Sequence, residues 1–487
     1  MSTTRVPGTR PRVLPGTRGT RRGSAGFLNA GRARAGDAPG RARVGGLVLL
    51  RKRLRTYPAC IAVDEPLEHV DGGGDVPLLH VVRGPLETGE VGPVEPGQTA
   101  PASRGGCPFA PPPAYEQARE EAPVTRVTLW DGSQCWLITR HEDVRAVLGD
   151  ARFSADATRP GFPFLTPGRK KPAGGRASFI RMDDPEHARL RRMLTADFMV
   201  KRIEAMRPEI QRLTDDLLDR MTASRSAADL VTEFALPLPS LVICRLLGVP
   251  YEDHDYFQER SRVLPHDGST AAEVVAAADE LVGYLTDLGK AREHAPDDGI
   301  ISRLMARGEL GVSEAAAMGR LLLIAGHETT ANMTALSVLA LLREPDQWTR
   351  LQEDPSLVKG AVEELLRYLS IVHNGVARAA TEDVTVGGRT IRAGEGVLCA
   401  LNTANRDADV FPSGADLDVA RDARRHVAFG FGVHQCLGQP LARVELRIAL
   451  ETIIRRLPDL RLDVPFEDIR FRDDMAVYGV YALPVAW

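Results

Sequence analysis

A long apolar stretch, residues 315–342, constrains the fold of this 487-residue chain more than any other feature. Read as a helix it is apolar on most of its circumference, with Ser313 as a plausible N-cap. A helix that is apolar all round lies in the middle of a large protein or spans a membrane. Because Arg320, His327 and Glu328 interrupt the run, we expect a buried central helix and no membrane association.

Charge is distributed unevenly along the chain. Residues 1–55 hold fourteen Lys or Arg and one acid, Asp37, so they carry a net charge of about +13 against about −16 elsewhere. The protein is therefore not a uniformly basic nucleic-acid binder. Residues 1–105 are rich in Gly, Pro and Arg without a regular period, which predicts disorder. We expect this extension to precede a single domain over residues 106–487.

The extension has two interpretations. It could be a flexible basic arm that binds an acidic partner or nucleic acid. It could instead be an over-extended gene start, since no methionine lies between Met1 and Met182.

The cysteine positions exclude several classes of protein. They stand at 60, 107, 135, 244, 399 and 436 without a Cys-x-x-Cys pair, which argues against zinc ribbons and thioredoxin-like sites. Their wide spacing is unlike a secreted disulfide framework. No secretory signal is evident, so we expect a reducing, cytoplasmic location.

Hydrophobic periodicity predicts a mainly α protein with minor β structure. Residues 124–129 and 135–139 flank a Trp-Asp-Gly-Ser turn, which predicts a β-hairpin. Short strand patterns occur at 384–386, 390–391 and 397–401. Helical patterns cover 142–148, 186–247, the 270s–290s, 315–342 and 442–457.

The strongest chemical signal is the segment Phe-Gly-Phe-Gly-Val-His-Gln-Cys-Leu-Gly at residues 429–438. Glycines allow a tight loop with close backbone approaches. Such a loop can turn backbone N–H groups toward the Cys436 sulfur, as a metal-ligating thiolate requires. The start of the helix at residue 442 also favours a thiolate. The alternative is a buried structural cysteine.

A second signal interrupts the central helix. Ala325-Gly326-His327-Glu328-Thr329 places an acid and an alcohol inside an apolar helix, which is costly without a function. The alternative is a kinked core helix, because threonine can bond back to helix carbonyls.

Two weaker signals are pairs on helix faces. Glu364 and Arg367, three apart, can form an ion pair. His187 and Arg191, four apart, could present two donors to one carboxylate, or could form a solvated basic face.

In this order the motifs resemble the cytochrome P450 family, and every fixed position of its Phe-Gly-x-Gly-x-His-x-Cys-x-Gly haem loop is present. The resemblance covers about residues 107–487. It implies one large helical domain with small sheets around a buried haem b. By the same resemblance Cys436 is the metal ligand, and the other cofactor-binding residues are Phe429, Gly430, His434, His187, Arg191 and Arg378.

The resemblance also implies catalytic and structural residues. Ala325 and Gly326 would leave room for oxygen, and Glu328 and Thr329 would relay protons. Glu364, Arg367 and Arg421 would brace the segment that leads to the cysteine loop.

The implied activity is that of a haem-thiolate monooxygenase. It would insert one atom of O₂ into a lipophilic small molecule by hydroxylation or epoxidation, with electrons from ferredoxin and ferredoxin reductase. We expect a cytoplasmic monomer. The alternatives are oxidative C–C or C–O coupling on the same scaffold, reduction of nitric oxide, and a haem sensor without turnover.

Overall fold

The computed structural model describes residues 99–487 except 101, 103, 166–177, 264–270 and 474. All of these residues belong to one unit of the chain. Residues 1–98, which form most of the predicted extension, lie outside the described part.

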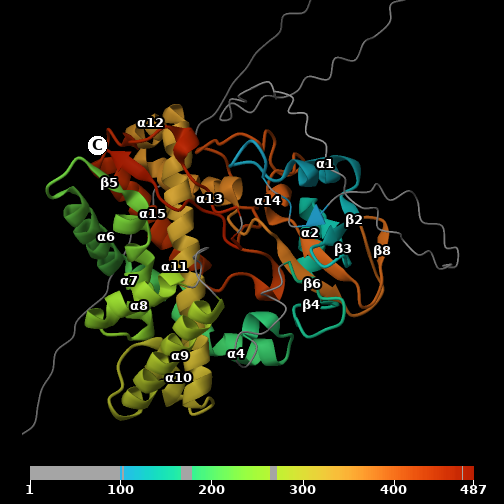
Figure 1. Cartoon of the computed structure of the whole chain (residues 1–487), viewed down its shortest axis with the longest axis horizontal. Coiled ribbons are helices and arrows are strands. Elements are labelled where there is room, and N and C mark those ends of the chain that lie inside the picture. Colours follow the sequence, from blue (N-terminus) through green and yellow to red (C-terminus); the bar gives the residue numbers. More distant parts are fainter. Residues whose placement is uncertain (1–98, 101, 103, 166–177, 264–270, 474) are drawn as a thin grey trace, which may run out of the picture. The chain divides into compact units, whose positions relative to one another are not determined.

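Helix α11 (Val312–Arg343) is the predicted central helix, and it contacts α7, α9, α10, α12, α13 and α15 (Figure 1). Its N-cap is Gly311 and not the predicted Ser313, because Glu314 turns back to accept a hydrogen bond from the Gly311 N–H at 3.1 Å. The helix ends at Arg343, two residues before Pro345, which disfavours the helical conformation in the residue preceding it. None of the described helices is long and apolar enough to cross a membrane.

The other helices pack around α11 or cover the sheet (Figure 1). Those that precede α11 are α1 (Pro113–Glu121), α2 (His141–Gly149), α4 (Glu186–Thr195), α5 (Val200–Ala205), α6 (Arg207–Thr222), α7 (Pro237–Leu247), α8 (His254–Val263), α9 (Ala271–His294) and α10 (Ile300–Ala306). Those that follow it are α12 (Pro345–Glu353), α13 (Val358–Leu369), α14 (Leu401–Ala404) and α15 (Gln439–Arg456).

The largest sheet has six strands in the order β1-β2-β3-β9-β6-β4. Its hairpin β2–β3 is the predicted one, with Val124 opposite Ile138 and a turn in which Gly132 has φ +80°. The strands are β1 (Thr99–Ala100), β2 (Val124–Leu129), β3 (Gln134–Ile138), β9 (Gly396–Cys399), β6 (Val376–Ala380) and β4 (Phe153–Ser154). A separate pair joins β7 (Val384–Val386) to β8 (Arg389–Ile391).

The helical pattern predicted over 186–247 is interrupted. Strand β5 (Ala227–Asp229) pairs with β11 (Pro484–Ala486), which in turn pairs with β10 (Arg461–Leu462). The partner of β5 lies more than 250 residues later in the chain, so no local period reveals this strand. The mainly α, minor β class and the cytochrome P450-like fold are otherwise as predicted.

Arg104 extends the packed fold into residues that we assigned to the extension. Its side chain is 2% exposed and donates to the carbonyl oxygens of Leu369 and Ser370 at 3.2 and 3.4 Å. Its guanidinium also lies 3.9 Å from the ring centre of Tyr478. Burial lowers the pKa of Arg104 to about 10. The described residues before Cys107 therefore contact the elements that surround the pocket.

Candidate functional site

A cavity of about 330 Å³ lies between α11 and the loop of residues 429–438. Ala325, Gly326 and Thr329 line it from α11, and Cys436 lines it from the loop. The cavity wall is predominantly apolar, with contributions from α2, α7, α13, β6 and α15. The structure thus brings the two strongest sequence motifs to one cavity.

The Cys436 loop is held by its own backbone. The Cys436 N–H donates to the carbonyl oxygen of Phe429 at 2.9 Å, which closes the loop. Burial raises the pKa of the Cys436 thiol, whereas the backbone N–H groups of Gly438 and Gln439 and the charge of Arg191 oppose this rise. These groups stabilise negative charge on sulfur, as a thiolate ligand requires.

Two glycines of the loop have left-handed conformations. Gly430 has φ +70° and Gly432 has φ +73°. A Cβ atom on Gly432 would lie 2.2 Å from the carbonyl oxygen of Leu148, whereas one on Gly430 would meet no atom within 4 Å. Gly432 is therefore required both for its conformation and for the close approach to α2.

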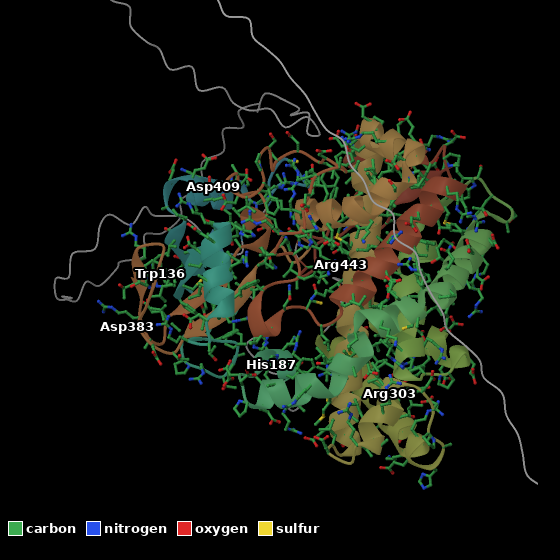
Figure 2. The ribbon with its side chains drawn as sticks, turned by 180° about the vertical axis from the view of Figure 1, so that it is seen from behind. Trp136, His187, Arg303, Asp383, Asp409 and Arg443 are labelled. Atoms are coloured by element: carbon green, nitrogen blue, oxygen red, sulfur yellow. The ribbon has the colours of Figure 1, made fainter. Side chains whose placement is uncertain are left out.

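Cationic and imidazole side chains gather at one end of the cavity, where Figure 2 labels His187. The rings of His187 and His434 lie 4.0 Å apart. Burial and the charge of Arg378 lower the pKa of His434 to about 4. Arg191 donates to the carbonyl oxygen of Gln435 at 2.6 Å. His187, Arg191, Arg378 and His434, four of the predicted cofactor-binding residues, thus lie around the cysteine loop.

Counter-charge at this end of the cavity is only partial, because Asp184 lies 2.9 Å from His187 Nδ1 but leaves the inner nitrogens unpaired. In the described part of the chain, His187 Nε2 and His434 Nδ1 are buried without hydrogen-bond partners. Arg378 is 7% exposed and forms no ion pair with any described residue. Buried donors and cations of this kind fit anionic groups such as carboxylates. Together with the Cys436 thiol and the apolar wall, they fit a haem with two propionates.

The predicted relay residues occupy one turn of α11. Thr329 faces the cavity, and its hydroxyl donates to the carbonyl oxygen of Ala325 at 2.6 Å. Glu328 lies on another face of the helix, 3.6 Å from a guanidinium nitrogen of Arg472. Helix α11 is continuous through this turn, and the bond from Thr329 to Ala325 is the back-bond expected of a threonine inside a helix.

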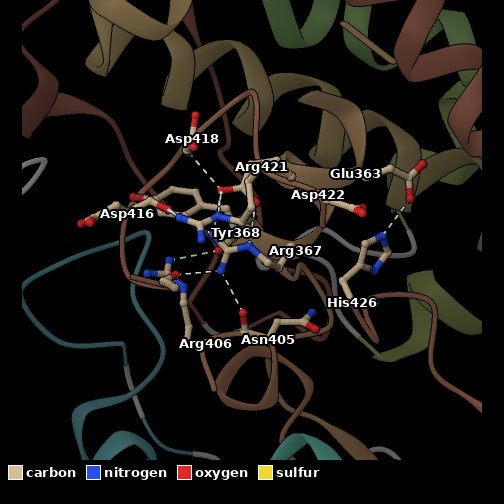
Figure 3. A network of polar contacts seen from close by, with 12 residues as sticks. Glu363, Arg367, Tyr368, Asn405, Arg406, Asp416, Asp418, Arg421, Asp422 and His426 are labelled. Atoms are coloured by element: carbon tan, nitrogen blue, oxygen red, sulfur yellow. Dashed lines mark hydrogen bonds and ion pairs between the residues drawn. The ribbon is translucent and has the colours of Figure 1, made fainter. Parts of the chain in front are cut away.

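Glu364, Arg367 and Arg421 form one network (Figure 3). Arg367 is fully buried and donates to both carboxylate oxygens of Glu364 at 2.7 and 2.8 Å. Its remaining N–H groups donate to the carbonyl oxygens of Asn405, Gly414 and Asp416. Arg421 also donates to Glu364, at 3.2 Å. The network links α13 to the segment that precedes the cysteine loop.

The sequence did not predict a second cluster of charged side chains, which is centred on Glu363. Arg443 and His426 contact its carboxylate at 2.7 and 3.2 Å, and Figure 3 shows the contact with His426. Both side chains also lie near the ring of Phe429. Burial opposes ionisation of Glu363, but the hydrogen bonds from His426 and Arg443 lower its pKa to about 2. The partners are 63 and 80 residues apart in sequence, so no local pattern indicates them.

Glu445 on α15 was also missed. It lines the cavity and is 2% exposed, and burial raises its pKa to about 8. Burial therefore favours the neutral form of this acid.

The segment before β6 forms part of the pocket wall. Ile371, Val372 and Val376 line the cavity, as expected for an apolar pocket. His373 is buried, and its Nε2 donates to the carbonyl oxygen of Met475 at 2.5 Å. It therefore supports the wall from behind and does not face solvent.

Comparison with known proteins agrees with this geometry. Residues 286–469 match the family model described as Cytochrome P450. Cytochrome P450-SU2 of Streptomyces griseolus is 73% identical over 390 residues, covering 80% of this chain and 97% of that protein. The vitamin D3 dihydroxylase of the same species is 47% identical over 395 residues, covering 80% and 97%.

Solved structures show the same fold. The mycinamicin VIII C21 methyl hydroxylase of Micromonospora griseorubida, solved with mycinamicin VIII bound, is similar with a TM-score of 0.75 and 42% identity. The match covers 80% of this chain and all of that one. On the sequence identity and coverage of these relatives, the chain belongs to the cytochrome P450 family of haem-dependent monooxygenases.

Proposed function

We propose that the protein hydroxylates or epoxidises a lipophilic natural product or xenobiotic, with haem b as the cofactor. The observation that carries this proposal is a single apolar cavity with Thr329 on one wall and Cys436 on another. The buried end formed by His187, His434 and Arg378 has the donors and charge to hold two propionates.

When bound, the haem supplies an iron centre that activates O₂. The Cys436 thiolate would be its ligand, stabilised by the N–H groups of Gly438 and Gln439. Thr329 faces the cavity and can accept a proton at Oγ1 while donating its own. Glu328, the adjacent residue, would supply that proton from solvent. The apolar wall would exclude water from the reacting centre.

The pocket wall favours an apolar substrate. Phe179, Ile180, Ile243, Ile371 and Val372 line the cavity, and such surfaces bind through burial of apolar area. Few polar groups on the wall are free to orient a substrate, because the arginines and histidines lie at the propionate end.

We further propose that an acidic ferredoxin, reduced by its reductase, delivers electrons at the surface beside Cys436. A shallow hollow there is lined by Arg191, Lys201 and the exposed Met199 and Val200. The location would be cytoplasmic and the protein a monomer. Arg424 would add little positive charge to such a surface, because Asp422 already pairs with it at 2.6 Å.

A reconstituted assay tests the proposal. Purified haem-loaded protein, a surrogate ferredoxin and its reductase are supplied with NADPH, ¹⁸O₂ and lipophilic compounds that shift the haem spectrum. We expect one labelled oxygen atom in the product. Unlabelled coupled products would instead show oxidative coupling, and binding without any product would favour a sensor.

Thr329→Ala gives a second test. The variant should retain haem and substrate binding but release more hydrogen peroxide per NADPH, because the hydroxyl that passes the proton is absent. Unchanged coupling of NADPH to product would remove Thr329 from the relay.

A further inference from the structure

The C-terminal hairpin, residues 470–481, packs on α11 at the turn that carries the relay acid. The Arg472 N–H donates to the Gly479 carbonyl oxygen at 2.9 Å, and Phe471 bridges to Val480. A Cβ atom on Gly479 would lie 1.8 Å from the side-chain oxygen of Asn332. The hairpin backbone therefore meets α11 where no side chain could fit.

The side chains of Asn332 and Arg472 contact Glu328 where the hairpin packs on α11. Asn332, one turn further along α11, donates to the Glu328 carbonyl oxygen at 2.9 Å. Arg472 lies across the hairpin from Gly479 and places a guanidinium nitrogen 3.6 Å from Glu328 Oε1. The side chains of Arg472 and Glu328 are only 11% and 17% exposed, so their attraction is less screened than that of a surface pair.

The distance between the Arg472 guanidinium and the Glu328 carboxylate indicates how the two groups interact. At 3.6 Å the pair is electrostatic and not a short hydrogen bond. The guanidinium is also held over the ring of Tyr481, 5.1 Å from its centre. Arg472 therefore contacts both the Glu328 carboxylate and the ring of Tyr481.

The same hairpin is bonded to the substrate pocket. The Tyr478 N–H donates to the carbonyl oxygen of Ile371 at 2.8 Å, and His373 donates to that of Met475. Ile371 lines the cavity. The hairpin thus connects the pocket wall with the acid on α11.

We propose that Arg472 is a positioning residue that keeps Glu328 oriented for proton delivery to Thr329. This inference rests on the proposed function, which places Glu328 and Thr329 in the relay. Glu328 takes up a proton that solvent delivers as hydronium and passes it to Oγ1 of Thr329, which gives up its own proton to the reacting centre. The carboxylate then returns to its position beside Arg472, so no oxidant or reductant is needed for this step.

The test uses haem-loaded full-length protein with three substitutions. Arg472→Gln removes the charge, Arg472→Lys restores it, and Arg470→Gln is the matched control. Arg470 lies in the same hairpin and 5.2 Å from the centre of the Tyr481 ring, but the residue is exposed. Haem content and the carbon monoxide spectrum show that each variant is folded.

The first measurement does not depend on turnover. The infrared difference between wild type and Glu328→Gln isolates the Glu328 carboxylate band. We expect Arg472→Gln to shift this band, Arg472→Lys to restore it largely, and Arg470→Gln to leave it unchanged. An unshifted band in Arg472→Gln, or equal shifts in both glutamine variants, overturns the proposal.

The second measurement is the ratio of peroxide to product during turnover. Arg472→Gln should raise this ratio several-fold in the wild-type background. It should not raise the ratio further in Glu328→Gln, because both substitutions disable the same step. Additive effects would overturn the proposal. A shifted band in a protein that makes no oxygenated product would instead refute the monooxygenase function and leave the positioning role intact.

Discussion

Replacing Glu364 with alanine should release the segment that leads to the cysteine loop. The Glu364 carboxylate accepts from Arg367 twice, from the Asp418 N–H at 3.0 Å and from Arg421. Both Glu364 and Arg367 are 0% exposed. Glu364→Ala therefore leaves the Arg367 guanidinium buried without its counter-charge.

The magnitude follows from this burial. Removing one partner of a buried ion pair costs about 3–5 kcal/mol, because the remaining charge stays desolvated. Whole domains are stable by only about 5–15 kcal/mol. We therefore expect Glu364→Ala to lose about a fifth or more of the free energy of unfolding. Since Arg367 also bonds to three carbonyls of the 405–416 segment, haem retention should fall with stability.

Urea-induced unfolding and the haem-to-protein ratio after gel filtration measure these effects. Asp422→Ala is the matched control, since Asp422 and Arg424 lie 2.6 Å apart but are largely exposed. The control should unfold like wild type, because exposed pairs contribute little. If Glu364→Ala keeps its full haem content and unfolds at the wild-type urea concentration, the bracing role is wrong.

Three further predictions concern the cysteine loop and its surroundings. Cys436→Ala should abolish the thiolate-type band of the reduced carbon monoxide complex; persistence of this band would disprove the ligand assignment. Gly432→Ala should lose far more haem than Gly430→Ala, because only the former Cβ would meet a backbone oxygen, 2.2 Å away; equal haem contents would contradict this. Glu363 has its pKa lowered from 4.5 to about 2, which corresponds to roughly 3 kcal/mol of stabilisation. Since the folded-state pKa is the lower one, this stabilisation is present above about pH 4.5 and lost as the pH falls through 2. In Glu363→Gln the free energy of unfolding should lack this decrease at acid pH. A pH dependence of unfolding equal to that of the wild type would refute the assignment.

Features with a local signature were predictable from the sequence. The β2–β3 hairpin, strand β7 and the central helix follow from turn residues and apolar periods, and the structure has them within a few residues. The residues around the cavity were predictable only through motif order, because a lone Glu-x-x-Arg or His-x-x-x-Arg is common on helix surfaces.

Features that depend on distant partners were not predictable. The N-cap of α11 is Gly311 and not the predicted Ser313, because the side chain of Glu314 folds back and accepts a hydrogen bond from the Gly311 N–H. Arg367 bonds to backbone carbonyls 38 to 49 residues away, and carbonyls carry no sequence signal. Arg472 reaches Glu328 across 144 positions of the chain, so only the folded hairpin reveals the pair.

Arg104 has a practical consequence for making the protein. Truncation at Cys107, where the recognisable motifs begin, would remove a guanidinium that lies between the 369–370 carbonyls and Tyr478. The vacated space would adjoin the chain segment that supports the substrate wall at Ile371. A shortened gene should therefore begin before Thr99. An affinity tag fused directly to Cys107 would replace Arg104, whose contacts support the pocket wall.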